Sequence, residues 1–189
     1  MVFPEADLVK NIEDKLKNFH LDPTGEYVYD GSYMQWNEDI KKEERDRTKK
    51  TVPALSLLSS ILLIILGCFK GTGMDGNPFM MLPYAADIII SLITVWKIIR
   101  FFYGLKKDEG KLKEYTYKET VKTLPGLATA GIVTASLSLL GFLITVSLYE
   151  GYGTGAVLYP VICALFLIFS VLLRKESKRL NNSFYLAKE

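Results

Sequence analysis

One acidic residue lies inside a long apolar stretch of this sequence, and its position is the clearest indication of chemistry. Asp87 falls within the stretch from residue 80 to residue 102. If a helix begins at Pro78, Asp87 lies roughly 13 Å along it. A charge at the centre of a bilayer costs about 2.5–3.5 kcal/mol on insertion scales, so such an acid is a functional candidate. Two interpretations stay open. Asp87 forms a proton or cation site, or a polar contact with another membrane subunit; or it lies in a water-filled notch, hydrogen-bonded to a hydroxyl group.

Hydroxyl groups at a similar depth are the expected hydrogen-bond donors to this carboxylate. Tyr84 precedes Asp87 by one helical turn, Tyr159 lies near the start of the last apolar stretch, and Thr145 and Ser147 are further donors. None of the other apolar stretches contains a lysine or arginine that would neutralise the acid. The sequence therefore predicts an intramembrane polar site formed by Asp87, Tyr84 and Tyr159.

Other kinds of chemistry lack the residues that they need. His20 is the only histidine, and Cys68 and Cys163 form no Cys-x-x-Cys motif, so we expect no metal site and no cofactor. The two thiols are expected to be small buried hydrophobic groups, although spacing leaves a disulfide open. No nucleophile elbow, phosphate-binding loop or dinucleotide fingerprint occurs, so the chain is not expected to be an enzyme. A lipid-modifying enzyme is a third option, for which no residue can be named.

Four apolar stretches fill most of the chain after residue 50. They cover approximately residues 52–69, 80–102, 124–148 and 156–173. A helix needs roughly 20 mostly apolar residues to cross the hydrocarbon core, and backbone groups in lipid must bond within their own segment. The sequence predicts an all-α membrane protein whose four-helix transmembrane bundle covers residues 51–174, followed by a cytoplasmic tail, 175–189. Asn77-Pro78 is typical of the N-cap and first residue of a helix.

The basic residues indicate how the bundle is oriented. Six Lys or Arg lie in residues 41–50, six lysines lie in residues 104–122, and five Lys or Arg follow residue 173, whereas the other two connections hold almost none. Positive residues favour the cytoplasmic side, so both termini are expected there. We expect the membrane to be the cell membrane. The net charge is only +2 and the basic runs are interleaved with acids, so nucleic-acid binding has no support.

The two halves of the membrane region resemble each other. Residues 51–55 (TVPAL) and 123–127 (TLPGL) open the first and third stretches, and GTG occurs at both 71–73 and 153–155. A duplicated helical hairpin accounts for this pattern. Convergence accounts for it equally, because proline is favoured in the first turn of a helix and glycine in tight turns.

Small side chains mark the third apolar stretch as a packing helix. They recur every fourth residue, which predicts one packing face formed by Gly126, Ala130, Thr134 and Ser138. In lipid, helices associate through close packing and interhelical hydrogen bonds, and small residues permit both. The sequence leaves open whether this face packs within one chain or against a partner.

The first 50 residues are predicted to form a small cytoplasmic region in three parts. An amphipathic helix is expected over 4–19, a β-hairpin over 26–36 with its turn at Asp30-Gly31, and a charged helix over 37–50 capped by Asn37. The basic connection 104–122 is expected to be a solvated loop with room for a short helix.

Apolar and aromatic residues of this region are the candidate partner-docking residues. They are Val9, Ile12, Leu16, Phe19, Tyr27, Tyr29, Tyr33 and Trp36. The mixed charge on the polar face of the helix favours docking on protein over lying on a membrane, whereas the aromatic rings of the hairpin suit either.

These features predict a non-enzymatic, multi-pass membrane protein that acts through protein contacts. It would be an accessory or scaffold subunit whose partners are the lipid bilayer and either another membrane protein or further copies of itself. The alternative is a small oligomeric transporter or channel in which Asp87 is linked to a proton or cation.

Overall fold

The structure is a computed structural model that describes residues 18–69, 72, 74, 77–108, 110–148 and 157–187. In chain order its elements are β1 (Phe19–Leu21), β2 (Tyr27–Tyr29), β3 (Tyr33–Trp36), α2 (Lys42–Cys68), α3 (Pro78–Lys107), β4 (Leu112–Lys113), α4 (Glu114–Glu119), η1 (Val121–Thr123), α5 (Leu124–Leu148), α6 (Leu158–Asn182) and β5 (Phe184–Leu186). The helix predicted over 4–19 lies outside the described residues except for its last two positions. Val9, Ile12, Leu16 and the glycines of both predicted outer turns lie outside them entirely.

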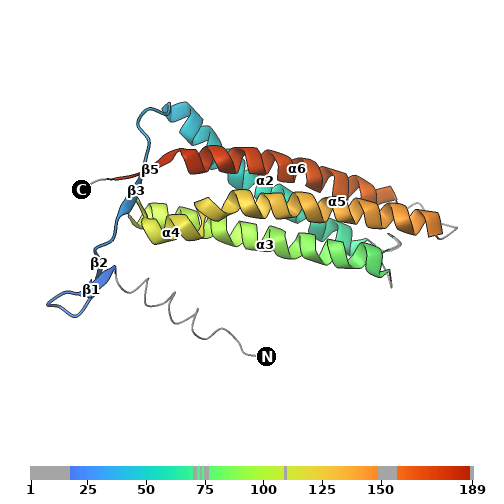
Figure 1. The fold of residues 1–189 in the computed structure, drawn as a ribbon, viewed down its shortest axis with the longest axis horizontal. Helices are drawn as coiled ribbons and strands as arrows, with labels where there is room; N and C mark the ends of the chain where they lie inside the picture. Colours follow the sequence, from blue (N-terminus) through green and yellow to red (C-terminus); the bar gives the residue numbers. More distant parts are fainter. Residues whose placement is uncertain are drawn as a thin grey trace.

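Within the described chain, four helices are long and apolar enough to cross a membrane, which confirms this part of the sequence prediction. α2, α3, α5 and α6 lie side by side and alternate in direction (Figure 1). α5 packs mainly against α3 and α6, and α2 packs mainly against the same two helices. Each long helix therefore has two principal neighbours, and the four form a closed bundle.

The start of α3 confirms the predicted cap. The side chain of Asn77 accepts a hydrogen bond from the backbone N–H of Phe79 at 3.0 Å, and Pro78 is the first helical residue. Proline is tolerated there because the N–H that it lacks would have no helical partner. The amide of Asn77 also donates to Thr145 Oγ1 at 2.8 Å, so this cap joins the beginning of α3 to the end of α5.

A small sheet joins three distant parts of the chain at one end of the bundle. β3 lies between β4 and β5 and pairs antiparallel with both, with Met34 opposite Leu112 on one side and Leu186 on the other. Figure 1 shows these strands at the end of the bundle where α2 begins and α6 finishes. The sheet therefore holds the segment before α2, the connection between α3 and α5, and the segment after α6 together.

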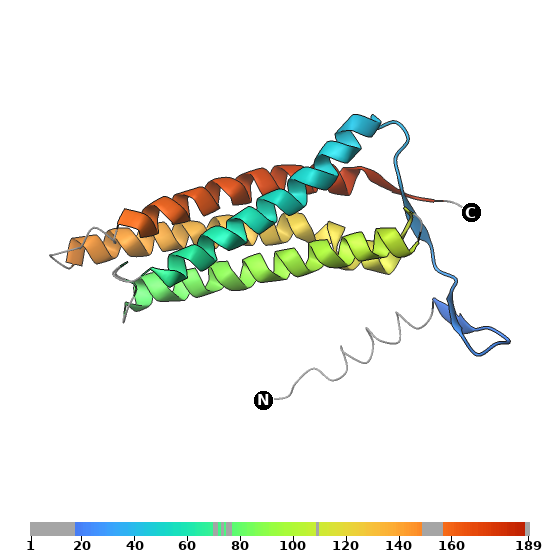
Figure 2. The same cartoon turned by 180° about the vertical axis from the view of Figure 1, so that it is seen from behind.

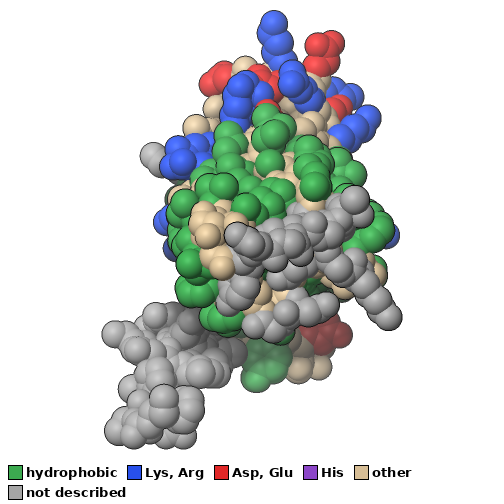
Figure 3. Space-filling model, turned by 90° about the vertical axis from the view of Figure 1, so that its right-hand side faces the viewer, with side chains coloured by type: hydrophobic (Ala, Val, Ile, Leu, Met, Phe, Trp, Pro, Cys, Tyr) green, Lys and Arg blue, Asp and Glu red, His purple; other side chains and the backbone are tan. Residues whose placement is uncertain are grey.

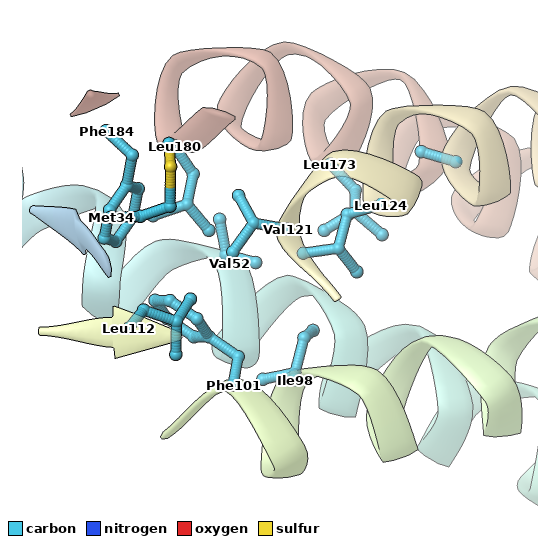
Figure 4. Packing of buried hydrophobic residues seen from close by; sticks show 11 residues of the cluster. Met34, Val52, Ile98, Phe101, Leu112, Val121, Leu124, Leu173, Leu180 and Phe184 are labelled. Carbon is cyan, nitrogen blue, oxygen red and sulfur yellow. The ribbon is translucent and has the colours of Figure 1, made fainter. Parts of the chain in front are cut away.

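The hydrophobic core beneath the sheet draws residues from all of these segments. Figure 4 shows them converging from β3, α2, α3, β4, η1, α5, α6 and β5; the labelled residues are Met34, Val52, Ile98, Phe101, Leu112, Val121, Leu124, Leu173, Leu180 and Phe184. All are buried. The solvated loop expected at 104–122 is therefore wrong, because Leu112 and Val121 are fully buried and hold β4, α4 and η1 against the bundle. The short helix for which this expectation left room is present as α4. In the segment expected to be a tail, 175–189, α6 continues to Asn182 and β5 follows it.

The predicted hairpin over 26–36 is wrong in its pairing. β2 pairs with β1, with Leu21 opposite Tyr27, and β3 pairs with β4 and β5 instead of β2. The hairpin turn is at Asp22–Gly25, where the Asp22 carboxylate accepts hydrogen bonds from the N–H and the hydroxyl of Thr24, and Gly25 adopts a φ of +85°. The Asp30-Gly31 pair links two sheets instead of two strands of one hairpin.

The charged helix expected over 37–50 begins later than predicted. α2 starts at Lys42, so Asn37 is not its cap. The backbone N–H of Asn37 donates to the Ser183 carbonyl at 2.8 Å, and its side chain accepts from the N–H of Asp39 at 3.1 Å. Asn37 therefore extends the pairing of β3 with β5 and forms a local turn, which competes with helix formation.

The packing face of α5 differs from the predicted one. Ser138 is fully buried and Thr134 and Ala130 are partly buried, but Gly126 is exposed. Residues four apart advance 400°, so a strict four-residue repeat drifts about 40° at each step and leaves the interface. The buried stripe instead combines steps of three and four residues; it consists of Leu124, Ala128, Gly131, Ala135, Ser138, Gly141 and Thr145.

Among the glycines of α5, Gly141 lies closest to the backbone of α3. A Cβ at this position would overlap the backbone carbonyl of Phe79. A backbone group at the start of a helix cannot move aside as a flexible side chain can. The contact therefore requires glycine.

We expect Gly141→Ala to lower the melting temperature of the detergent-purified protein, because overpacking destabilises by about 1–3 kcal/mol. Gly126→Ala is the matched control. Nothing lies within 4 Å of a Cβ at Gly126, and alanine is the better helix former, so its melting temperature should equal or exceed that of the wild type. Equal melting of the two variants would contradict the close approach of α5 to α3.

Candidate functional site

The carboxylate of Asp87 is held between α3 and α5, in the interior of the bundle. Asp87 has 0% exposure, although it lies in a helix whose neighbouring residues Ile89 and Leu92 are exposed. Thr134 Oγ1 donates to Asp87 Oδ1, and Ser138 Oγ donates to Asp87 Oδ2 at 2.8 Å. Each carboxylate oxygen therefore has its own hydroxyl donor.

Both donors come from one face of α5. Thr134 and Ser138 are four residues apart, so one helical turn places their hydroxyls at successive levels on the side facing α3. The sequence predicts a helix-packing role for both residues but no contact with Asp87. Their polarity and i, i+4 spacing were the available signal, because hydroxyl groups on a packing face of a membrane helix need an acceptor nearby.

The two tyrosines that were predicted to bind Asp87 donate elsewhere. Tyr84 Oη donates to the backbone carbonyl of Leu63 at 2.8 Å and so joins α3 to α2. Tyr159 Oη donates to the backbone carbonyl of Met80 at 2.9 Å and joins α6 to α3. The predicted hydrogen bonds from the tyrosines are thus corrected: Thr134 and Ser138 donate to the acid, and the two tyrosines donate to backbone carbonyls of neighbouring helices. Tyr159 nevertheless stays next to the site, because its hydroxyl also lies within hydrogen-bonding reach of Ser138.

The remaining expected donors also have other acceptors. Thr145 Oγ1 bonds to the Gly141 carbonyl at 2.7 Å, and Ser147 Oγ bonds to the Leu143 carbonyl at 2.9 Å, each within α5. Ser147 thus bonds within its own helix, whereas the Thr145 hydroxyl also accepts from the amide of Asn77 at the start of α3. These hydrogen bonds do not reach the Asp87 carboxylate.

Further hydroxyl groups lie between the helices. Ser60 Oγ of α2 and Ser91 Oγ of α3 are 2.5 Å apart. A cavity of about 10 Å³ lies among apolar side chains and four hydroxyl groups, those of Ser59, Ser91, Thr94 and Ser170. This is at the lower end of the volume that one buried water occupies. The bundle interior is therefore polar at several levels, but in discrete sites.

The arrangement around Asp87 can do two things chemically. Two hydroxyl donors stabilise an ionised carboxylate, since hydrogen bonds to charged groups contribute about 1.5–3 kcal/mol each. The same hydroxyls can accept a hydrogen bond from a protonated carboxyl, because a hydroxyl is both donor and acceptor. No lysine or arginine within the described residues pairs with Asp87. The site can therefore join α3 to α5 in either protonation state.

Most of the described docking candidates are used in packing within the chain. Phe19, Tyr29, Tyr33 and Tyr115 form an aromatic cluster, with ring centroids 5.1–6.0 Å apart. The ring of Trp36 packs in a tilted arrangement against that of Phe184, with centroids 4.2 Å apart, and Lys49 Nζ is 4.4 Å from the Trp36 ring centroid. Burial raises the pKa of Tyr29 to about 12, and its hydroxyl donates to the Ser32 carbonyl at 3.1 Å. Tyr27 alone among these candidates is exposed.

The structure and the site define a class: a four-helix bundle of membrane-spanning length with an acid held inside it and a small sheet at one end. Both cysteines are free, with Cys68 exposed and Cys163 buried. No cluster of metal-binding side chains occurs within the described residues. The chain matches no protein-family model, no curated protein and no solved structure with which it was compared.

Ser138→Ala is expected to lower stability by about 1–3 kcal/mol, because it leaves one buried carboxylate oxygen without its donor. Ser136→Ala is the matched control, since among the described residues Ser136 Oγ bonds to the Ile132 carbonyl of its own helix and not to another helix. The measurement is thermal unfolding in detergent. In an Asp87→Leu background the Ser138→Ala effect should shrink toward that of Ser136→Ala. An unchanged Ser138→Ala effect in that background would contradict the pairing with Asp87.

Proposed function

We propose that this chain is an integral membrane protein that spans the bilayer four times and acts through contacts with another membrane protein. The length and apolar composition of α2, α3, α5 and α6 support insertion. Their outward surfaces carry many exposed large hydrophobic side chains, including Leu82, Trp96 and Leu143, which water would not favour. In Figure 3 hydrophobic side chains cover much of the visible bundle, and the charged ones gather toward one edge.

Both termini and the connection between α3 and α5 are proposed to lie in the cytoplasm. The basic runs 41–50 and 104–122 and the basic residues after 173 lie at the helix ends that meet near the sheet. This common location fits the preference of positive residues for the cytoplasmic side. The sheet and the β1–β2 hairpin would then be the part of the described chain that faces cytoplasmic or membrane-bound partners.

The observation that carries the proposed contact is the exposed apolar surface of the β1–β2 hairpin. Leu21, Tyr27 and Val28 are 58%, 67% and 39% exposed. Figures 1 and 2 show this hairpin extending beyond the sheet, away from the helices. The aromatic cluster of Phe19, Tyr29 and Tyr115 attaches the open end of the hairpin to α4. Leu21 pairs with Tyr27 on the same face nearer the turn, where both stay exposed. A short hairpin that is held at its open end and has exposed apolar residues near its turn is suited to docking on a protein.

The test is purification of the tagged full chain from its native membranes in mild detergent, with and without Leu21→Ser and Tyr27→Ser together. We expect the wild type to retain a stoichiometric membrane partner and the double variant to lose most of it, because the variant removes the apolar contact. Leu186→Ser with Tyr185→Ser is the matched control, since it makes the same two replacements on exposed residues of β5. The hairpin contact would be refuted if the hairpin variant retained the partner, or if the hairpin variant and the β5 variant lost it equally.

Asp87 supports a second candidate function, a small oligomeric transporter in which the acid is linked to a proton or cation. The supporting observation is an acid at 0% exposure without a cationic partner in the described chain. Such an acid within a membrane segment is typical of ion and proton pathways. The buried hydroxyls on the other helices would then bind the proton or cation on its way to or from Asp87.

Under this second function Asp87→Asn should abolish pH-coupled flux in reconstituted vesicles, because an amide cannot exchange the proton. Asp108→Asn, which makes the same replacement at the end of α3, should leave the flux unchanged. Flux that persists in Asp87→Asn would exclude the acid as the coupling site. No flux in the wild type would leave the contact function as the one supported.

A further inference from the structure

An apolar groove opens on the outer surface of the bundle between α2 and α3. Its volume is about 240 Å³, and its lining residues are Pro53, Ser56, Leu57, Val95, Ile98, Ile99 and Phe102. Ser56 is the polar exception: it is buried, and its Oγ has no hydrogen-bond partner among the described residues. The groove is therefore lined by apolar side chains and by one hydroxyl group that has no hydrogen-bond partner among the described residues.

The groove exists because α2 crosses the bundle obliquely. In Figure 2, α2 lies beside α3 at the end where α3 begins and passes toward α6 at the end near the sheet. The two helices therefore diverge toward the sheet. Ile98 and Phe101 of α3 and Val52 of α2 fill the inner part of the gap, as Figure 4 shows, and the outer part stays open as the groove.

Two lysines lie one helical turn beyond groove residues, in the direction of the sheet. Lys50 precedes Pro53 by three residues on α2, and Lys106 follows Phe102 by four residues on α3, so each shares the helix face of a groove residue. Both side chains are exposed, and neither forms an ion pair within the described chain. Asp46 is one turn further from the groove on α2. The mouth of the groove is thus positively charged.

We infer that this groove binds one acyl chain of an anionic phospholipid from the leaflet on the sheet side, with the lipid phosphate between Lys50 and Lys106. This inference rests on the proposed membrane insertion. The apolar walls suit a hydrocarbon chain, and the two lysines lie one turn beyond them, at the level where a headgroup would be. The Ser56 hydroxyl offers a hydrogen bond to an ester oxygen, which a purely hydrocarbon occupant lacks.

The size of the groove limits what can lie inside it. One turn of helix, 5.4 Å long and about 10 Å wide, fills about 400 Å³. The groove volume of about 240 Å³ is smaller, so a helix of another protein could place only side chains in the groove, whereas an acyl chain fits along it. Groove residues on α3 extend from Val95 to Phe102, which is about 10 Å along the helix and matches part of one acyl chain.

The test is native mass spectrometry of the delipidated full chain, titrated with phosphatidylglycerol or with phosphatidylcholine of the same acyl chains. The wild type should bind one phosphatidylglycerol about tenfold more tightly than phosphatidylcholine, because two lysines attract the extra negative charge. Lys50→Gln with Lys106→Gln should abolish this preference. Lys111→Gln with Lys178→Gln, which removes the same charge from exposed lysines elsewhere, should keep it.

A second pair of variants tests the groove itself. Ile99→Trp fills the groove and should prevent tight binding of both lipids. Ile144→Trp places the same side chain on an exposed position of α5 outside the groove and should bind as the wild type does. Thermal unfolding of each variant establishes that it is folded before it is titrated.

The possible outcomes separate this inference from the proposed function. Equal binding of the two lipids, or no effect of Ile99→Trp on binding, would overturn the groove assignment. A wild-type dimer that Ile99→Trp dissociates would also overturn it, because a second copy of the chain would then occupy the groove. Alkaline carbonate extraction of the native membranes tests insertion separately. Release of the chain would overturn the membrane proposal and the lipid site with it, whereas a retained chain without lipid preference would overturn the lipid site alone.

Discussion

The pairing of β3 with both β4 and β5 is the constraint on which the arrangement of this chain depends. Helices in lipid are not driven together by the hydrophobic effect, because lipid tails are as apolar as leucine. The core beneath β3 is different, since it lies at the end of the bundle where the chain becomes polar. Met34, Leu112 and Phe184 are buried there, on three strands that come from distant parts of the sequence. At this end water itself favours closing the bundle.

Inside the bundle, hydrogen bonds and close packing hold the helices together. Thr134 and Ser138 bind Asp87, Ser60 lies against Ser91, and Gly141 allows α5 to approach the backbone at Phe79. Each contact joins a different level or pair of helices. The polar groups that are expensive to bury in lipid are therefore also those that specify which helices are neighbours.

The sequence predicted structure correctly where a local pattern has no competition from a distant segment. Apolar length predicted the four long helices, and Asn77-Pro78 predicted where α3 begins, because both depend on adjacent residues. It failed where a distant segment competes. Asp30-Gly31 is a strong hairpin signal, yet β3 pairs with strands about 80 and 150 residues further along the chain. No spacing rule reveals such partners. The donors to Asp87 were not predicted for a related reason. A tyrosine hydroxyl can reach many acceptors, and it is the packing of α5 against α3 that brings Thr134 and Ser138 to the carboxylate.

The order of the strands has a consequence for biosynthesis. β3 is made before any of the four long helices, β4 only after two of them, and β5 only after the last. One edge of β3 lacks its partner until β4 is made and the other until β5 is made, and the core around Met34 is incomplete until then. The complete sheet can therefore form only after every long helix has been made. A chain that stops early keeps an open strand edge, which is a template for pairing with other chains.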